Sequence, residues 1–307
     1  MIRIRFITFI ALLISPFILL GYSVQKETQV FAVKDGQELK MDIYQSDSVS
    51  ILPQPCIVFV FGGGFKGGSR DFQDYAGFFN YFANRGYTVV SIDYRLGMKG
   101  QEAPGMLNYK PIQNAIDLAV SDLFSATNYL LENAENLHID PSLIIISGSS
   151  AGAITVLQAD YEERDNQPTA DVLPVDFRYA GVISFAGGIF SKEGLPSYSQ
   201  KPAPTLFFHG SADRLVPYDK IRLFQIGMFG SNSLVKRFKQ ERYPYQFYSI
   251  ENIGHEVSEY PMFEFLPEID KFINDFVLDR KQLMIDINYK DIMRKSEQSD
   301  TPGSYYN

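Results

Sequence analysis

One short stretch constrains this chain more than any other: an apolar run that stops abruptly in small residues. Leu-Ile-Ile-Ile at 143–146 leads into Ser147-Gly148-Ser149-Ser150-Ala151-Gly152, and a helix-forming segment follows. This order predicts a buried strand, a sharp turn and a helix. Gly-x-Ser-x-Gly is the sequence of a nucleophile elbow, whose small flanking residues allow a serine to adopt a strained backbone and expose its hydroxyl above a sheet. Ser150 is therefore a candidate nucleophile, although an ordinary glycine-serine turn would have the same local sequence.

The N-terminal residues have the composition of a secretory signal peptide. Basic residues precede an uncharged apolar stretch from Phe6 to Leu20, and small residues follow it. We expect cleavage after Ser23, so that residues 1–23 direct export to the periplasm or the medium. An uncleaved membrane anchor is the alternative, but the stretch is short for a spanning helix and Pro16 interrupts it. We therefore expect no stable membrane insertion after cleavage.

The charge balance limits the possible binding partners, and the single cysteine excludes an internal disulfide. The chain has 28 Lys and Arg residues against 36 Asp and Glu, a formal charge of −8, and loss of the signal peptide removes only the basic Arg3 and Arg5. An acidic protein repels nucleic acid, so we expect no nucleic-acid partner. Cys56 lies in an apolar run and has no second cysteine with which to form an internal disulfide. It is most simply a small core residue.

Alternation of apolar strands with amphipathic helices predicts a mostly parallel central sheet. Asp35-Gly36 separates two alternating segments and predicts an antiparallel hairpin over residues 30–44. Further strands are predicted at 56–61, 87–92, 143–147, 181–186, 205–208 and 246–250, and helices near 72–84, 112–137, 153–157 and 267–278. Such a sheet carries helices on both faces and active groups at the carboxyl ends of its strands. We expect one domain, residues 24–289, followed by a polar C-terminal tail, residues 290–307.

Two later strand ends supply the partners that an activated serine needs. Asp213 follows one predicted strand and His255 lies just past the next. A serine nucleophile needs a base, and the base needs a carboxylate that orients it and stabilises its charge. Ser150, Asp213 and His255 occur in the order expected after this type of elbow, so we predict His255 as the base and Asp213 as the orienting carboxylate. Asp219 is the nearest rival to Asp213, and a turn-capping aspartate and a loop histidine without a role are the simpler alternatives.

A glycine triplet follows the predicted central strand directly. Acyl transfer needs backbone N–H donors aimed at the oxygen that becomes negative in the transition state. Gly62-Gly63-Gly64 can approach a substrate closely because glycine has no side chain. We assign Gly63 and Gly64, together with the N–H of Ala151, to an oxyanion hole. A structural turn is the competing interpretation.

In combination these motifs resemble the α/β-hydrolase fold, and within it the carboxylesterase and hormone-sensitive-lipase-like esterases, over nearly the whole mature chain. The matching pieces are Gly62-Gly63-Gly64-Phe65, Ser91-Ile92-Asp93-Tyr94-Arg95-Leu96, Ile139-Asp140-Pro141, Gly148 to Gly152, His209-Gly210-x-x-Asp213 with Val216-Pro217, and Gly254-His255. The resemblance implies a Ser-His-Asp esterase mechanism without metal or cofactor. The chain departs from the family at Phe61, where a positioning histidine usually precedes the glycines, and in a long segment at Gly97 to Lys110 that we expect to border the pocket.

The leading hypothesis is an exported serine hydrolase that cleaves a carboxylic ester. A serine peptidase of the prolyl-oligopeptidase type is similar in these motifs, although its usual propeller domain is absent here, and a non-catalytic binding module on a hydrolase fold is the third possibility. Residues 160–177 are too short and polar for a large lid, and the expected border segments 97–110 and 191–203 are polar with proline and glycine. These features favour short acyl groups on a small or polymer-linked alcohol, such as a carbohydrate, over long lipid chains.

Overall fold

The computed structural model describes residues 23–47, 52–105 and 107–306, so the predicted signal peptide lies, apart from Ser23, outside the described residues. Its centre is a nine-stranded sheet with the order β1-β2-β4-β3-β5-β6-β8-β11-β12. The first strands pair antiparallel, β1 with β2 and β2 with β4, and the pairs from β4 through β12 are parallel. The strands are β1 (Val24–Lys34), β2 (Gln37–Ser46), β3 (Gln54–Val60), β4 (Thr88–Ile92), β5 (Ile139–Ser149), β6 (Gly181–Phe185), β8 (Thr205–Gly210), β11 (Tyr245–Ile250) and β12 (Met284–Tyr289).

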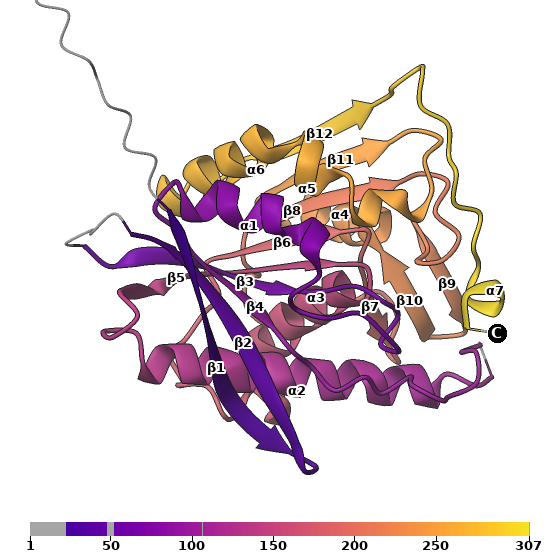
Figure 1. Ribbon diagram of the computed structural model, residues 1–307. Helices are drawn as coiled ribbons and strands as arrows, with labels where there is room; N and C mark the ends of the chain where they lie inside the picture. Colours follow the sequence, from indigo (N-terminus) through magenta and orange to yellow (C-terminus); the bar gives the residue numbers. More distant parts are fainter. Residues whose placement is uncertain (1–22, 48–51, 106, 307) are drawn as a thin grey trace, which may run out of the picture.

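Helices cover both faces of this sheet (Figure 1). Helices α1, α5 and α6 lie on one side, and α2 and α3 pack together on the other. The bounds are α1 (Ala76–Ala83), α2 (Lys110–Glu132), α3 (Ala151–Arg164), α4 (Ser231–Glu241), α5 (Pro261–Glu264), α6 (Leu266–Phe272) and α7 (Pro302–Tyr306), with a π-helical turn at Ile273–Leu278 and 3₁₀ turns at Gln73–Tyr75, Pro168–Ala170 and His255–Ser258. The predicted fold class, a mostly parallel sheet with an antiparallel N-terminal hairpin, is confirmed.

The central strands are apolar because both of their faces are covered. In β3 the side chains from Cys56 to Val60 are fully buried, and Cys56 is a free core residue. Phe59 of β3 contacts the rings of Phe78 and Phe79 on α1. Burial of this kind fixes the register of the parallel strands, and with it the positions at which their carboxyl ends meet.

A second, three-stranded antiparallel sheet stands beyond the carboxyl edge of the main sheet and was not predicted. Its order is β7-β10-β9, from β7 (Gly188–Ser191), β10 (Ile226–Gly230) and β9 (Lys220–Leu223). The two-residue turn between β9 and β10 contains Phe224 at φ +55°. Asn-Gly and Asp-Gly turns are recognised because such residues tolerate positive φ. A phenylalanine in that position carries no turn signal, so the hairpin is hidden in the sequence.

The C-terminal part of the chain adds an edge strand and then returns across the sheet. The strand β12 pairs in parallel with β11. Residues 290–306 then run past the carboxyl ends of the strands to α7, at the right of Figure 1. The predicted domain limit at residue 289 coincides with the end of β12, and the division into a domain and a tail stays a prediction.

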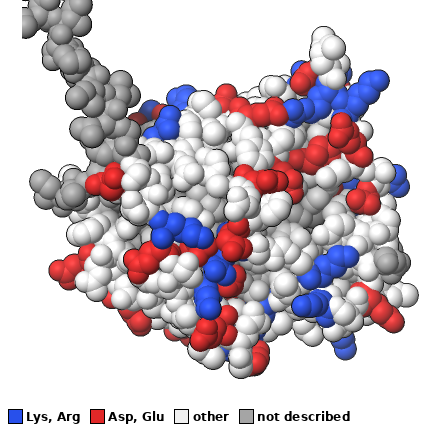
Figure 2. Space-filling model, in the orientation of Figure 1, with Lys and Arg blue, Asp and Glu red and all other residues white. Residues whose placement is uncertain are grey.

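The surface has mixed charge. Acidic and basic side chains are interspersed over the face shown in Figure 2. Within the described residues, no helix combines the length and apolar character needed to cross a membrane.

Candidate active site

The strand β5, the turn at Ser150 and the helix α3 form the predicted elbow. Ser150 has φ +51° and ψ −113°, and its N–H donates to the carbonyl oxygen of Phe185 at 2.9 Å. Glycine is required on both sides: a Cβ on Gly148 would overlap the backbone of Gly152, and one on Gly152 would overlap the carbonyl oxygen of Val60. The strained serine is thus held where parallel strands end, with its side chain directed out of the sheet.

The structure brings Ser150, His255 and Asp213 together in one hydrogen-bonded line. The hydroxyl of Ser150 lies 2.7 Å from Nε2 of His255, and Nδ1 of His255 lies 2.7 Å from Oδ2 of Asp213. An ionised carboxylate only accepts hydrogen bonds, so Nδ1 carries the proton and Nε2 is left to accept from the serine. This is the arrangement that allows a histidine to remove the serine proton.

Backbone hydrogen bonds join the loop that carries Asp213 to the loop that carries His255. The N–H of Ser211 donates to Ile250 at 2.8 Å, and that of Ala212 donates to Ile253 at 2.9 Å, which joins the loop after β8 to the loop after β11. A Cβ on Gly210 would overlap the carbonyl oxygen of Ile253. The distance between Asp213 and His255 is therefore set by main-chain contacts.

Asp213 is buried and charged. Its Oδ1 accepts from the N–H groups of Leu215 and Val216 at 2.9 and 3.0 Å. Burial alone would raise the pKa of Asp213, but hydrogen bonds from His209 and His255 outweigh it and hold the pKa well below its ordinary value. The carboxylate therefore stays ionised and can stabilise a protonated His255.

His209 is a second histidine at this carboxylate, and the sequence analysis assigned it no role. Its Nε2 lies 3.3 Å from Oδ2 of Asp213 and 3.2 Å from the carbonyl oxygen of Val216. Both neighbours are acceptors, so Nε2 carries the proton, and Nδ1 accepts from the Ser231 hydroxyl at 2.8 Å. The His-Gly-x-x-Asp spacing was visible in the sequence, but only the fold shows that the first and last residues of that stretch touch.

The rival carboxylate, Asp219, has other partners. It accepts hydrogen bonds from Asn232, Ser233 and Lys236 at 3.1, 2.8 and 3.0 Å. These three residues belong to α4, so Asp219 ties the chain before β9 to the first turns of that helix. The structure pairs Asp213, not Asp219, with the histidine.

The glycine loop lies beside the elbow. Gly63 and Gly64 have φ values of +111° and +62°, and a Cβ on Gly63 would overlap the carbonyl oxygen of Gly67. The turn from Gly63 to Gly67 is closed by two hydrogen bonds. The N–H groups of Lys66 and Gly67 both donate to the carbonyl oxygen of Gly63 at 3.1 Å. Among the hydrogen bonds of the described residues, none uses the N–H of Gly63, Gly64 or Ala151. These donors remain available to a negative oxygen, as an oxyanion hole requires.

Phe61 fills the place of the histidine that usually precedes the glycines. Its ring stacks on Tyr94 with centroids 4.4 Å apart, and the Tyr94 hydroxyl donates to the Phe61 carbonyl oxygen at 3.1 Å. Gly68 approaches so closely that a Cβ there would meet the Phe61 ring at 2.7 Å. The glycine loop is therefore supported by apolar packing at this position.

A cavity of about 260 Å³ opens above Ser150 and Ala151. We use the name pocket cover for three parts that line it beside the glycine loop: the β7-β10-β9 sheet, the described residues of segment 97–110 (97–105 and 107–110) and the C-terminal strap, residues 290–306. The lining residues of these parts are mostly apolar: Phe190, Ile221, Ile226, Gly227 and Met228; Pro104, Gly105 and Tyr109; and Pro302, Tyr305 and Tyr306. Segment 97–110 thus borders the pocket as expected. The other expected border, 191–203, was wrong: it contributes none of the described lining residues, because the chain turns away after β7.

No group of three or more His, Cys, Asp or Glu side chains in the described ranges is arranged to hold a metal ion. The expectation that the protein uses no metal or cofactor stays a prediction.

Comparison with known proteins agrees with this fold and with the motifs at the site. The BD-FAE family model matches residues 41–187, which include the glycine loop and the elbow. The propionate-bound Thermogutta terrifontis esterase 2 superposes with a TM-score of 0.62, at 22% identity, over 84% of this chain and 95% of that chain. Together with the fold, these matches support a carboxylesterase-type α/β hydrolase. The resemblance identified in the sequence is thereby confirmed.

Curated relatives of this hydrolase match over shorter segments. The fumonisin B1 esterase of Sphingopyxis macrogoltabida is 30% identical over 116 residues, 38% of this chain and 21% of that protein. Gut esterase 1 of Caenorhabditis elegans is 33% identical over 104 residues, 34% of this chain and 18% of that protein. The hydrolase thus spans about a fifth of the length of these relatives.

Proposed function

We propose that this protein is an exported serine esterase in which Ser150, His255 and Asp213 cleave carboxylic esters. The observation that carries the proposal is the pair of 2.7 Å hydrogen bonds from serine to histidine and from histidine to aspartate, beside a cavity that Ser150 lines. The esterases among its relatives and structural neighbours support the reaction class.

The reaction proceeds in two halves. His255 Nε2 takes the hydroxyl proton as Ser150 Oγ bonds to the ester carbon, and Asp213 stabilises the imidazolium. The carbonyl oxygen becomes negative and accepts hydrogen bonds from Gly63, Gly64 and Ala151. The carbon–oxygen bond to the alcohol then breaks, and the alcohol leaves with the proton from His255. Water attacks the acyl-serine with His255 again as base, which releases the acid and restores Ser150.

We propose short acyl groups, acetyl to butyryl, on a small or carbohydrate-linked alcohol. A cavity of about 260 Å³ supports an acyl group of this size. The structural neighbour Thermogutta terrifontis esterase 2 has been captured with propionate and with butyrate. Export would bring the enzyme to esters outside the cytoplasm.

A substrate panel tests the reaction class. We expect kcat/KM to be highest for acetyl to butyryl in a series of acetyl, butyryl, octanoyl and palmitoyl esters of one alcohol, with no cleavage of peptide anilides. Cleavage of anilides in place of esters would favour the peptidase hypothesis. Absence of turnover on every compound would favour a binding module.

Export is tested separately, because its sequence support lies in residues 1–23. Mass spectrometry of protein recovered from the exported fraction should give an N-terminus at or within a few residues of Val24. A full-length chain held in the membrane would contradict the proposal.

A further inference from the structure

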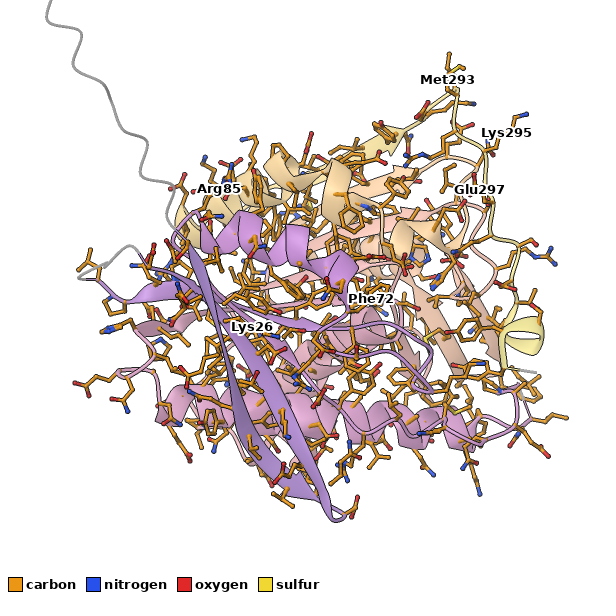
Figure 3. The ribbon with its side chains drawn as sticks, in the orientation of Figure 1. Lys26, Phe72, Arg85, Met293, Lys295 and Glu297 are labelled. Atoms are coloured by element: carbon orange, nitrogen blue, oxygen red, sulfur yellow. The ribbon has the colours of Figure 1, made fainter. Side chains whose placement is uncertain are left out.

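The C-terminal strap first crosses the loop that carries His255. The guanidinium of Arg294 pairs with Glu264 and lies 4.1 Å from the centre of the Tyr260 ring. The N–H of Glu297 donates to Glu256, the residue after His255, at 3.0 Å. A Cβ on Gly254, the residue before His255, would meet the carbonyl oxygen of Gln298 at 2.6 Å. Figure 3 labels Met293, Lys295 and Glu297 along this course.

The strap then ends against the glycine loop. The Tyr306 hydroxyl donates to the carbonyl oxygen of Gly64 at 2.7 Å, and a Cβ on Gly64 would meet the Tyr305 ring at 2.5 Å. Lys66 anchors the helix α7: its ammonium donates to the carbonyl oxygen of Tyr305 and lies 4.5 Å and 5.2 Å from the centres of the Tyr305 and Tyr306 rings. A cation held over two aromatic faces and hydrogen-bonded to the same helix fixes both rings in place.

Both rings line the cavity that Ser150 lines. Gly64 is one of the predicted oxyanion donors, so the Tyr305 ring stands next to the point where an ester carbonyl would bind. On another wall of the cavity Tyr109 stacks on Phe190 at 5.7 Å. A substrate chain extending past Gly64 would therefore meet Tyr305 within a short distance of the reacting carbon.

We propose that Tyr305 and Tyr306 are specificity-determining residues, which close the cavity beside the oxyanion loop and set the length of ester that it accepts. This inference rests on the proposed esterase function. Lys66 acts through the two rings as a positioning residue. The predicted preference for short acyl groups then has a defined physical cause in α7, since residues 160–177 form no large lid.

The test compares chain-length profiles of four proteins. We expect Tyr305→Ala and Lys66→Met to raise the octanoyl-to-acetyl ratio of kcat/KM about tenfold, mainly through a lower KM for octanoyl esters, because each opens the wall at α7. Tyr129→Ala is the matched control. That tyrosine is also partly buried, donates to Gln29 from α2 at 2.7 Å and does not line the cavity, so its profile should equal that of the wild type.

The outcomes separate this inference from the proposed function. An active wild type whose ratio is unchanged by both substitutions would overturn the role of the strap and leave the esterase assignment standing. Equal loss of kcat on every ester would also overturn it, because a merely structural contact does not change chain-length preference. A wild type that hydrolyses no ester would overturn both. If Tyr305→Ala does not fold, the ratio in Lys66→Met decides.

Discussion

The loops that carry the proposed catalytic residues, here called the catalytic loops, and the pocket cover of this hydrolase are built in different ways. The loops that follow β3, β5, β8 and β11 stand at the ends of buried parallel strands, and glycines there touch main-chain atoms that leave no room for a Cβ. The cover uses short segments: β7 and β9 have four residues each and α7 has five. Close main-chain fit occurs in the cover as well, at Gly227 and Gly230 of β10. The two regions therefore differ in the length of their elements and in the side-chain contacts that hold the strap, not in glycine packing alone.

If this contrast holds, a change in the catalytic loops should reduce turnover of every ester. Asp213→Asn should lower kcat by roughly 10³- to 10⁴-fold while the protein stays folded, because an amide cannot stabilise protonated His255. The measurement is kcat on a butyryl ester together with the thermal unfolding midpoint. Asp219→Asn is the control and should stay within a few-fold of the wild type, since Asp219 binds residues of α4. A severe loss in the control with a mild loss at Asp213 would reverse the assignment.

The close packing of the elbow glycines should contribute to the free energy of unfolding. A Cβ at Gly152 would overlap the carbonyl oxygen of Val60, so Gly152→Ala should lower the free energy of unfolding by about 3 kcal/mol or more. Gly77→Ala on α1 meets nothing within 4 Å and should raise it by about 0.5 kcal/mol through a lower chain entropy in the unfolded state. Urea unfolding of both variants makes the comparison, and equal stabilities would show that the elbow is not tightly packed.

The smallest effect is expected in the pocket cover. Met228 on β10 lines the cavity, so Met228→Ala should raise the octanoyl-to-acetyl ratio of kcat/KM by roughly fivefold and leave acetyl turnover almost unchanged. Met284, on the edge strand β12, is 49% exposed and serves as the control. A loss of turnover on all esters at Met228→Ala would remove the distinction between cover and catalytic loops.

The central strands and the turn at Ser150 could be predicted from the sequence. Apolar runs located the central strands, and the Gly-x-Ser-x-Gly spacing located the turn at Ser150, because each pattern has one common structural solution. Positions after predicted strand ends, together with chain order, picked out Asp213 and His255, and the fold places Nδ1 of His255 2.7 Å from Oδ2 of Asp213. The catalytic roles of these residues stay predictions.

The pocket cover could not be predicted because its structure depends on contacts between residues far apart in the sequence. Phe224 adopts a positive φ, which the sequence does not indicate because phenylalanine is not a typical turn residue. The β9-β10 hairpin was therefore not predicted. The strap is a polar stretch whose position depends on Lys66 and Gly64, more than 200 residues earlier in the chain. His209 likewise had no visible role until β8 and its loop brought it to Asp213.

The most direct test of the account is the identity of the nucleophile. Fluorophosphonate treatment followed by intact-mass measurement and peptide mapping should give one adduct per chain, located on Ser150. Ser150→Ala should remove the adduct, and Ser149→Ala should retain it, because Ser150 lines the cavity and Ser149 does not. An adduct on another serine, or labelling that survives in Ser150→Ala, would contradict the central claim.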